Sequence, residues 1–144
     1  CHPPGKNMKS VVLDASIILN YLFTETKNVN KLVTKILKQA EKKQLKLLSV
    51  SYLPLEVANG LRFKLKDPTL AEEVIVKFMA LPIKLYELSN PQLLQTTKLS
   101  YTMGTTIYDI AYHLLAIAHH ATFLTCDHKY YMQAKDLGSI ESCG

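Results

Sequence analysis

Four carboxylates occur where an α/β protein could bring acidic side chains together: Asp14, Glu56, Asp109 and Asp127. Asp14 and Asp127 each follow a short apolar run of the kind that forms a buried strand. Glu56 and Asp109 lie in the first turns of predicted helices that follow strands or loops. Because the carboxyl ends of parallel strands meet at one edge of a sheet, we expect these acids to converge there.

Converging carboxylates repel one another, so such a cluster needs a cation. Hard oxygen ligands select Mg²⁺ or Mn²⁺ over softer metals, and helix N-termini help to keep the acids ionised. Each acid also has a structural interpretation: Asp14 and Asp127 as helix N-caps, Asp109 in a capping box with Thr106, and Glu56 as a partner of the helix dipole. Three of the chain's five aspartates, together with Glu56, occupy positions of this kind, and this favours a shared site.

The elements that would position these acids alternate along the chain. The apolar runs predict strands ending at Leu13, at 46–50, 82–86 and 121–125, with a short fifth strand near Ile140. Helical spacing and breakers predict helices at 15–23, 29–44, about 54–66, 69–80, 91–104, 106–120 and about 128–138. This order predicts an α/β fold with a parallel sheet and helices on both faces.

Length and composition indicate one ordinary globular domain. The chain has 144 residues, of which 48% are hydrophobic and 20% charged, and no apolar run approaches membrane-spanning length. Residues 1–7 lack periodicity, so we expect a disordered lead or an expression remnant before a single domain at 8–144, with Met8 as the native start. The three cysteines have no metal-like spacing, and a reducing, cytoplasmic location fits them best.

The order and local context of the acids resemble a PIN domain. The motifs that carry the resemblance are Val-Val-Leu-Asp14-Ala-Ser16, Leu55-Glu56-Val-Ala-Asn-Gly-Leu-Arg62, Thr106-Ile-Tyr-Asp109 and Thr122-Phe-Leu-Thr125-Cys-Asp127. The compact length is most similar to VapC-type toxins of toxin–antitoxin pairs. The resemblance implies a three-layer α/β/α sandwich around a parallel sheet of about five strands, and Mg²⁺- or Mn²⁺-dependent ribonuclease activity. It also implies a homodimer silenced by a small antitoxin.

The resemblance also implies roles for individual residues. Asp14, Glu56, Asp109 and Asp127 would be the metal-binding and catalytic acids, while Ser16 and Thr125 would support them or contact substrate. Many family members carry a further acidic or amide residue shortly after the last aspartate, but His128 and Lys129 follow it here. The number of ions, one or two, therefore stays open, and His128 or Lys129 would supply positive charge or a proton if the second ion is missing.

Two alternatives remain from the sequence. The chain could be a non-catalytic PIN-like module that binds RNA or protein, or a housekeeping nuclease of RNA maturation or DNA processing. His113 and His120 share a helix face without a nearby cysteine, so we expect buried or pocket-lining groups rather than a zinc site. For the homodimer we expect surface from Leu53, Leu55, Phe63 and the helix at 69–80.

The net charge of +5 comes from sixteen lysines and Arg62, a balance that suits a polyanion such as RNA. One lysine stripe, formed by Lys31, Lys35, Lys38 and Lys42, lies opposite the apolar face of the 29–44 helix. Such a stripe is usually only solvated. We therefore favour Lys129, beside the last aspartate, as the residue that positions a phosphate.

Overall fold

The computed structural model describes residues 8–143, so the predicted lead at 1–7 lies outside the described residues. Five strands form one parallel sheet in the order β3-β2-β1-β4-β5. Their bounds are β1 Lys9–Leu13, β2 Leu45–Val50, β3 Ile83–Tyr86, β4 Thr122–Thr125 and β5 Ile140–Ser142. The parallel sheet and its five strands confirm the predicted fold class.

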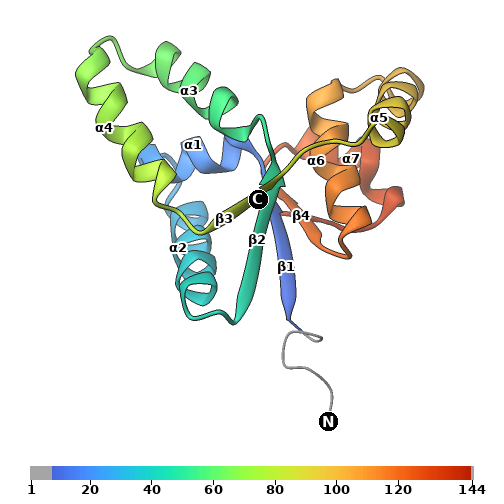
Figure 1. Ribbon diagram of the computed structural model, residues 1–144, viewed down its shortest axis with the longest axis horizontal. Coiled ribbons are helices and arrows are strands. Elements are labelled where there is room, and N and C mark those ends of the chain that lie inside the picture. Colours follow the sequence, from blue (N-terminus) through green and yellow to red (C-terminus); the bar gives the residue numbers. More distant parts are fainter. Residues whose placement is uncertain (1–7, 144) are drawn as a thin grey trace.

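Helices cover both faces of this sheet. Figure 1 shows α1 (Ala15–Phe23), α2 (Lys27–Glu41), α3 (Leu53–Lys64) and α4 (Pro68–Met79) on one side. On the other side lie α5 (Asn90–Met103), α6 (Ile107–Ala118) and α7 (His128–Ala134), which continues into the short 3₁₀ helix η2 (Lys135–Leu137). The three-layer α/β/α arrangement is therefore confirmed.

The most buried helix is α6, which contacts β1, β2 and β4. Every residue from Ile110 to Ala116 is buried, as its nearly continuous apolar sequence predicts. Among them, His113 contacts the Tyr130 hydroxyl through Nδ1 and the Gly138 carbonyl oxygen through Nε2, at 2.7 Å each. A carbonyl can only accept, so Nε2 carries the proton and Nδ1 accepts from Tyr130. His113 is thus a buried structural group that holds α7 against α6.

Several boundaries differ from the sequence prediction for local reasons. Helix α2 ends at Glu41 rather than at residue 44, because Lys43 adopts the left-handed conformation at φ 59°. Helix α7 ends at Ala134, and Gly138 at φ 77° turns the chain into β5. Cys126 and Cys143 form a disulfide, a pairing that the sequence did not predict. Within residues 8–143, no helix is long and apolar enough to cross a membrane.

The packing of α3 on α1 depends on a glycine. A Cβ atom at Gly60 would overlap the side chain of Leu19, so the two helices approach more closely than an alanine would allow without movement of Leu19. Helix α1 begins directly after Asp14, and Glu56 lies one turn before Gly60. This contact therefore helps to set the position of Glu56 relative to Asp14.

Candidate active site

The four predicted acids line one open pocket of about 360 Å³ at the carboxyl ends of β1 and β4. They come from separate parts of the chain. Asp14 follows β1, Glu56 lies on α3 and Asp109 lies on α6. Asp127 follows β4 and precedes α7. The parallel sheet thus brings the acids together as the sequence predicted, while their catalytic and metal-binding roles stay predictions.

Asp14 is the buried member of the cluster, with only 5% of its surface exposed. Its Oδ1 atom caps α1 by accepting hydrogen bonds from the Ile17 amide at 2.9 Å and the Ser16 hydroxyl at 2.8 Å. Burial raises the pKa of Asp14 to about 6, against the lowering effect of these hydrogen bonds. One carboxylate oxygen therefore serves the helix, and Oδ2 takes no protein hydrogen bond within the described chain.

Glu56 is held by a tyrosine from another helix. The Tyr112 hydroxyl on α6 donates a hydrogen bond of 2.5 Å to Glu56 Oε1. Burial raises the pKa of Glu56, while the bond from Tyr112 opposes that rise. Tyr52 packs edge-on against Tyr112, with ring centroids 5.5 Å apart, and so supports this contact between α3 and α6.

Asp109 and Asp127 lie at the starts of α6 and α7. The Asp109 amide donates to Thr106 Oγ1 at 3.1 Å, which caps α6 through Thr106. Burial raises the pKa of Asp109, and the charge of Asp127 adds to the rise. Asp127 Oδ1 accepts from the Tyr130 amide at 3.0 Å and caps α7. Asp127 therefore caps a helix as foreseen and also lines the shared pocket, whereas α6 shows only the Thr106 half of the predicted capping box.

The pocket carries negative charge that its own lining does not neutralise. No lysine or arginine lines it, and its fifth acid, Glu25, is paired with Lys64 at 2.6 Å. The raised pKa values of Asp14, Glu56 and Asp109 show that burial and mutual repulsion already act against their ionised forms. A bound cation would offset this repulsion and favour the ionised form of all of them together.

The donor chemistry fits a hard divalent cation. Carboxylate oxygens and the Ser16 hydroxyl are oxygen ligands of the kind that Mg²⁺ and Mn²⁺ prefer. Across residues 8–143, no three His, Cys, Asp or Glu side chains already stand close enough to hold one ion together. Mg²⁺ usually keeps several of its water ligands, so direct bonds to one or two carboxylates suffice.

The four accessory residues predicted from the sequence fall in different places. Ser16 lines the pocket and hydrogen-bonds to Asp14, whereas Thr125 is buried and its Oγ1 accepts from the Asp127 amide at 3.0 Å. Lys129 lines a neighbouring pocket that also includes Asp109 and Asp127. His128 is exposed at the start of α7 and lines neither pocket.

Sequence reasoning missed several residues of this pocket: Asn20, Glu25, Tyr112 and Cys126. Tyr112 lies three residues after Asp109, a spacing that places both side chains on one face of α6, and this signal could have identified it. Glu25 gives no comparable signal, because it lies in the turn between α1 and α2 and only the folded chain brings it to the pocket.

Comparison with known proteins gives matches by structure alone. No sequence-family model matches the chain, and no curated protein matches it significantly in sequence. The structure is similar to VapBC2 from Rickettsia felis bound to a DNA fragment from its promoter, with a TM-score of 0.68 and 16% identity over 92% of this chain and 98% of that one. It is also similar to PAE2754 from Pyrobaculum aerophilum, with a TM-score of 0.64 and 20% identity over 94% and 90% of the two chains.

A toxin–antitoxin complex from Klebsiella pneumoniae is a third match, with a TM-score of 0.64 and 14% identity over 93% of this chain and 98% of that one. These neighbours are PIN-domain structures, and the superpositions cover nearly the whole length of both partners. At this level of identity the likeness concerns the fold. The chain therefore has the PIN-like fold that its sequence motifs imply, shared with the VapC toxins of VapBC pairs.

Proposed function

We propose that the protein is a metal-dependent endoribonuclease that hydrolyses RNA phosphodiester bonds in its acidic pocket. The observation that carries the proposal is the convergence of Asp14, Glu56, Asp109 and Asp127 in one pocket without a neutralising lysine or arginine. Asp14 and Asp109 would hold Mg²⁺ or Mn²⁺, with Asp127 and Glu56 completing the set for one or two ions. The bound metal would activate water and offset the charge that develops on the phosphate.

The chain's own residues hold these acids in place. The hydrogen bonds from Ser16 and Ile17 fix the Asp14 carboxylate, and the Tyr112 hydroxyl fixes Glu56. Thr125 orders the turn that carries Asp127. Lys129, in the pocket shared with Asp109 and Asp127, would bind the substrate phosphate next to the acids.

A cleavage assay on a panel of RNAs with Mg²⁺, Mn²⁺ or EDTA tests this proposal. We expect cleavage with either metal and none with EDTA. For substitutions of the pocket acids, Asp136→Asn is a matched control that should cleave like the parent chain. Asp136 is exposed on η2 and lies outside the pocket. Metal-independent binding without cleavage of any RNA would favour the alternative, a non-catalytic RNA- or protein-binding module.

We further propose that the protein is the toxin of a toxin–antitoxin pair and acts in the cytoplasm. Support comes from the structural neighbours, which include toxin–antitoxin assemblies. An antitoxin-like reading frame beside the gene, whose product suppresses cleavage, would distinguish this role from housekeeping RNA processing. Because a reducing cytoplasm would hold Cys126 and Cys143 as thiols, their redox state in freshly lysed cells tests the location.

Exposed apolar side chains on α3 and α4 support a homodimer. Phe63 is 83% exposed, Met79 70% and Leu55 76%. Leu53 was wrongly assigned to this surface, because it is fully buried in the core. We expect sedimentation at micromolar concentration to give a dimer for the parent chain and a monomer for Phe63→Ser with Met79→Ser. Tyr101→Ser removes an equally exposed aromatic ring from α5 and should leave the dimer intact.

A further inference from the structure

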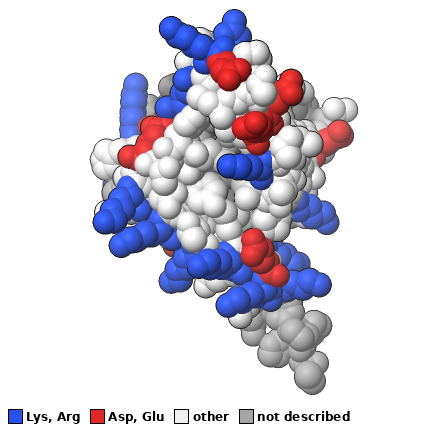
Figure 2. Space-filling view, turned by 90° about the vertical axis from the view of Figure 1, so that its left-hand side faces the viewer, with Lys and Arg blue, Asp and Glu red and all other residues white. Residues whose placement is uncertain are grey.

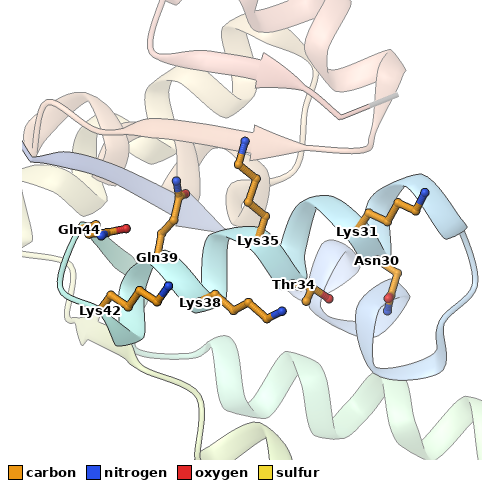
Figure 3. A pocket seen from close by; sticks show the side chains of 8 residues that line it. All are labelled: Asn30, Lys31, Thr34, Lys35, Lys38, Gln39, Lys42 and Gln44. Atoms are coloured by element: carbon orange, nitrogen blue, oxygen red, sulfur yellow. The ribbon is translucent and has the colours of Figure 1, made fainter.

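A row of lysines lines a hollow along the outer face of α2. Figure 3 shows this hollow, which has a volume of about 510 Å³ and which we call the lysine groove. It is lined by Lys31, Lys35, Lys38 and Lys42 together with the neutral polar residues Asn30, Thr34, Gln39 and Gln44. The opposite face of α2 carries the buried residues Val29, Val33, Ile36 and Leu37. The groove therefore lies on the side of the helix that faces away from the core.

The positive charge of the groove is not neutralised by neighbouring acids. Across residues 8–143, the single ion pair within 4 Å joins Lys64 to Glu25, so the groove lysines have no ion-pair partner. No acid lines the groove, and Glu41, the one acidic residue of α2, is outside its lining. Figure 2 shows that basic side chains predominate over the lower half of this face, at the level of α2 in Figure 1, with an acidic side chain among them.

The groove begins close to the acidic pocket. Asn20, which lines the pocket, donates through Nδ2 to the hydroxyl of Thr26, the residue that precedes α2, and its Oδ1 accepts from the Thr26 backbone amide. Asn30, at the near end of the groove, donates to the Tyr21 carbonyl on α1. From Lys31 the lysines continue to Lys42, a distance of about 16 Å at the rise of an α-helix. The groove thus runs from near the residues that line the pocket to the end of α2 that precedes β2, at the amino ends of the strands.

The charges of the acidic pocket and of the lysine groove indicate which kind of ligand the groove would bind. The acidic pocket repels phosphates, so a polyanionic substrate needs cations outside it. Lysines repeated along one line match a chain whose charges also repeat along its length, and the amide side chains can hydrogen-bond to sugars or bases. We infer that the lysine groove binds the phosphate backbone of single-stranded RNA on one side of the bond to be cleaved. The inference rests on the proposed function for the choice of RNA.

Equilibrium binding in EDTA tests the groove without cleavage. The probe is a labelled single-stranded RNA of about sixteen nucleotides, titrated over a range of salt concentrations. In the variant with Gln at Lys31, Lys35, Lys38 and Lys42, we expect affinity at low salt to fall about tenfold or more. The slope of log K against log salt should flatten by roughly 0.7 for each lost contact, hence by about 3.

The matched control replaces the same number of exposed lysines elsewhere: Lys46, Lys66, Lys98 and Lys135, each to Gln. It lowers the net charge by the same amount but leaves the groove intact. It should therefore retain most of the affinity and of the salt slope. Equal losses in both variants would show that only net charge matters and would overturn the groove. Unchanged binding in the groove variant would overturn it as well.

Two further probes separate ligand classes. An RNA of about four nucleotides is too short to fill both pocket and groove, so the groove substitutions should weaken its binding much less than that of the longer strand. Poly-glutamate of matched charge should compete poorly with RNA on the parent chain. Competition as strong as that of RNA would point to an acidic protein partner and would overturn the assignment to RNA.

The RNA-binding experiment and the cleavage assay test separate proposals, so each proposal can fail without the other. Groove-dependent RNA binding without any metal-dependent cleavage would contradict the proposed nuclease but support the groove. Metal-dependent cleavage with normal RNA binding by the groove variant would support the nuclease and overturn the groove.

Discussion

The acidic pocket and the lysine groove are both strongly charged, but their charges are held in different ways. In the pocket, Asp14 is nearly buried and its position is fixed by two hydrogen bonds, and Glu56 is fixed by Tyr112. In the groove, lysine side chains project from one helix face into solvent. Buried groups with fixed geometry suit bond cleavage, and exposed flexible cations suit capture of a long anionic chain.

The difference in burial should appear as a difference in salt dependence. Charges exposed to solvent are screened over about 8–10 Å at ordinary ionic strength, while buried charges are screened much less. Substitutions in the pocket should therefore change turnover at any salt concentration. Substitutions in the groove should change binding mainly at low salt.

The largest expected effect is the loss of cleavage in Asp14→Asn and in Asp109→Asn. Each change removes a carboxylate from the shared pocket, and loss of a metal ligand removes several kcal/mol of transition-state stabilisation. We expect cleavage to fall at least about a thousandfold and calorimetry to show no Mn²⁺ binding. Undiminished Mn²⁺ affinity in both variants would contradict a shared metal site. RNA binding in EDTA should be kept, because the groove is intact.

The second prediction concerns the stability of the metal-free protein against pH. Burial raises the pKa of Asp14 from 3.8 to about 6, so folding disfavours its ionised form. The stability associated with this residue is therefore fully present below pH 3.8 and is lost as the pH rises through 6, a change of roughly 3 kcal/mol. Glu56 and Asp109 act in the same direction.

Urea denaturation in EDTA between pH 4 and pH 7 measures this effect. Asp14→Asn should unfold at higher urea than the parent chain at pH 7, because asparagine can still cap α1 without carrying the charge. Its stability should also depend less on pH. Asp136→Asn serves as the control, and equal pH dependence in the parent and Asp14→Asn would contradict the prediction.

A moderate effect on turnover is expected for Lys129→Ala. This variant tests whether a lysine next to the acidic pocket acts separately from the lysine groove. Lys129 shares a pocket with Asp109 and Asp127, so its removal should lower turnover at saturating RNA by about tenfold. The salt slope of binding should change by about one at most, since one contact is lost. Unchanged turnover in Lys129→Ala would place phosphate recognition entirely in the groove.

The smallest expected effect is that of Tyr112→Phe. The Tyr112 hydroxyl donates to Glu56 and counteracts the rise in the pKa of that carboxyl, so its removal should raise the pKa further. We expect the acid limb of the pH–rate profile to move to higher pH. The rate near pH 6 should fall by roughly fivefold at most, the value of one hydrogen bond. Tyr101→Phe, on an exposed ring of α5, should leave the profile unchanged.

Most of the fold could be predicted because the periodicity of the sequence is strong. The run from Val11 to Leu13 and the nearly apolar α6 both occupy the core positions that their patterns indicate. Errors arose where burial depends on tertiary contacts. Leu53 begins α3 and packs into the core, although its neighbour Leu55 is exposed. The end of α7 depends on a 3₁₀ turn that periodicity does not encode.

The candidate site could be predicted only in part. Asp14 and Asp127 carry a clear local signal, an acid within two residues of the end of a strand and before a helix. Glu25 and the Cys126–Cys143 disulfide carry none, because their contacts form between segments that only the fold brings together. The lysine groove shows a third situation. The stripe on α2 is plain in the sequence, but its relation to the pocket depends on the hydrogen bonds of Asn20 and Asn30.

The strand order has a consequence for the timing of synthesis. The first strand, β1, lies at the centre of the sheet, between β2 and β4, and β4 is made of residues 122–125. A chain still on the ribosome therefore lacks one neighbour of its central strand until residues 122–125 have emerged. Asp109 and Asp127 also emerge later than Asp14 and Glu56. The acidic pocket can therefore be completed only after Asp127 has emerged, later than Asp14, Glu56 and Asp109.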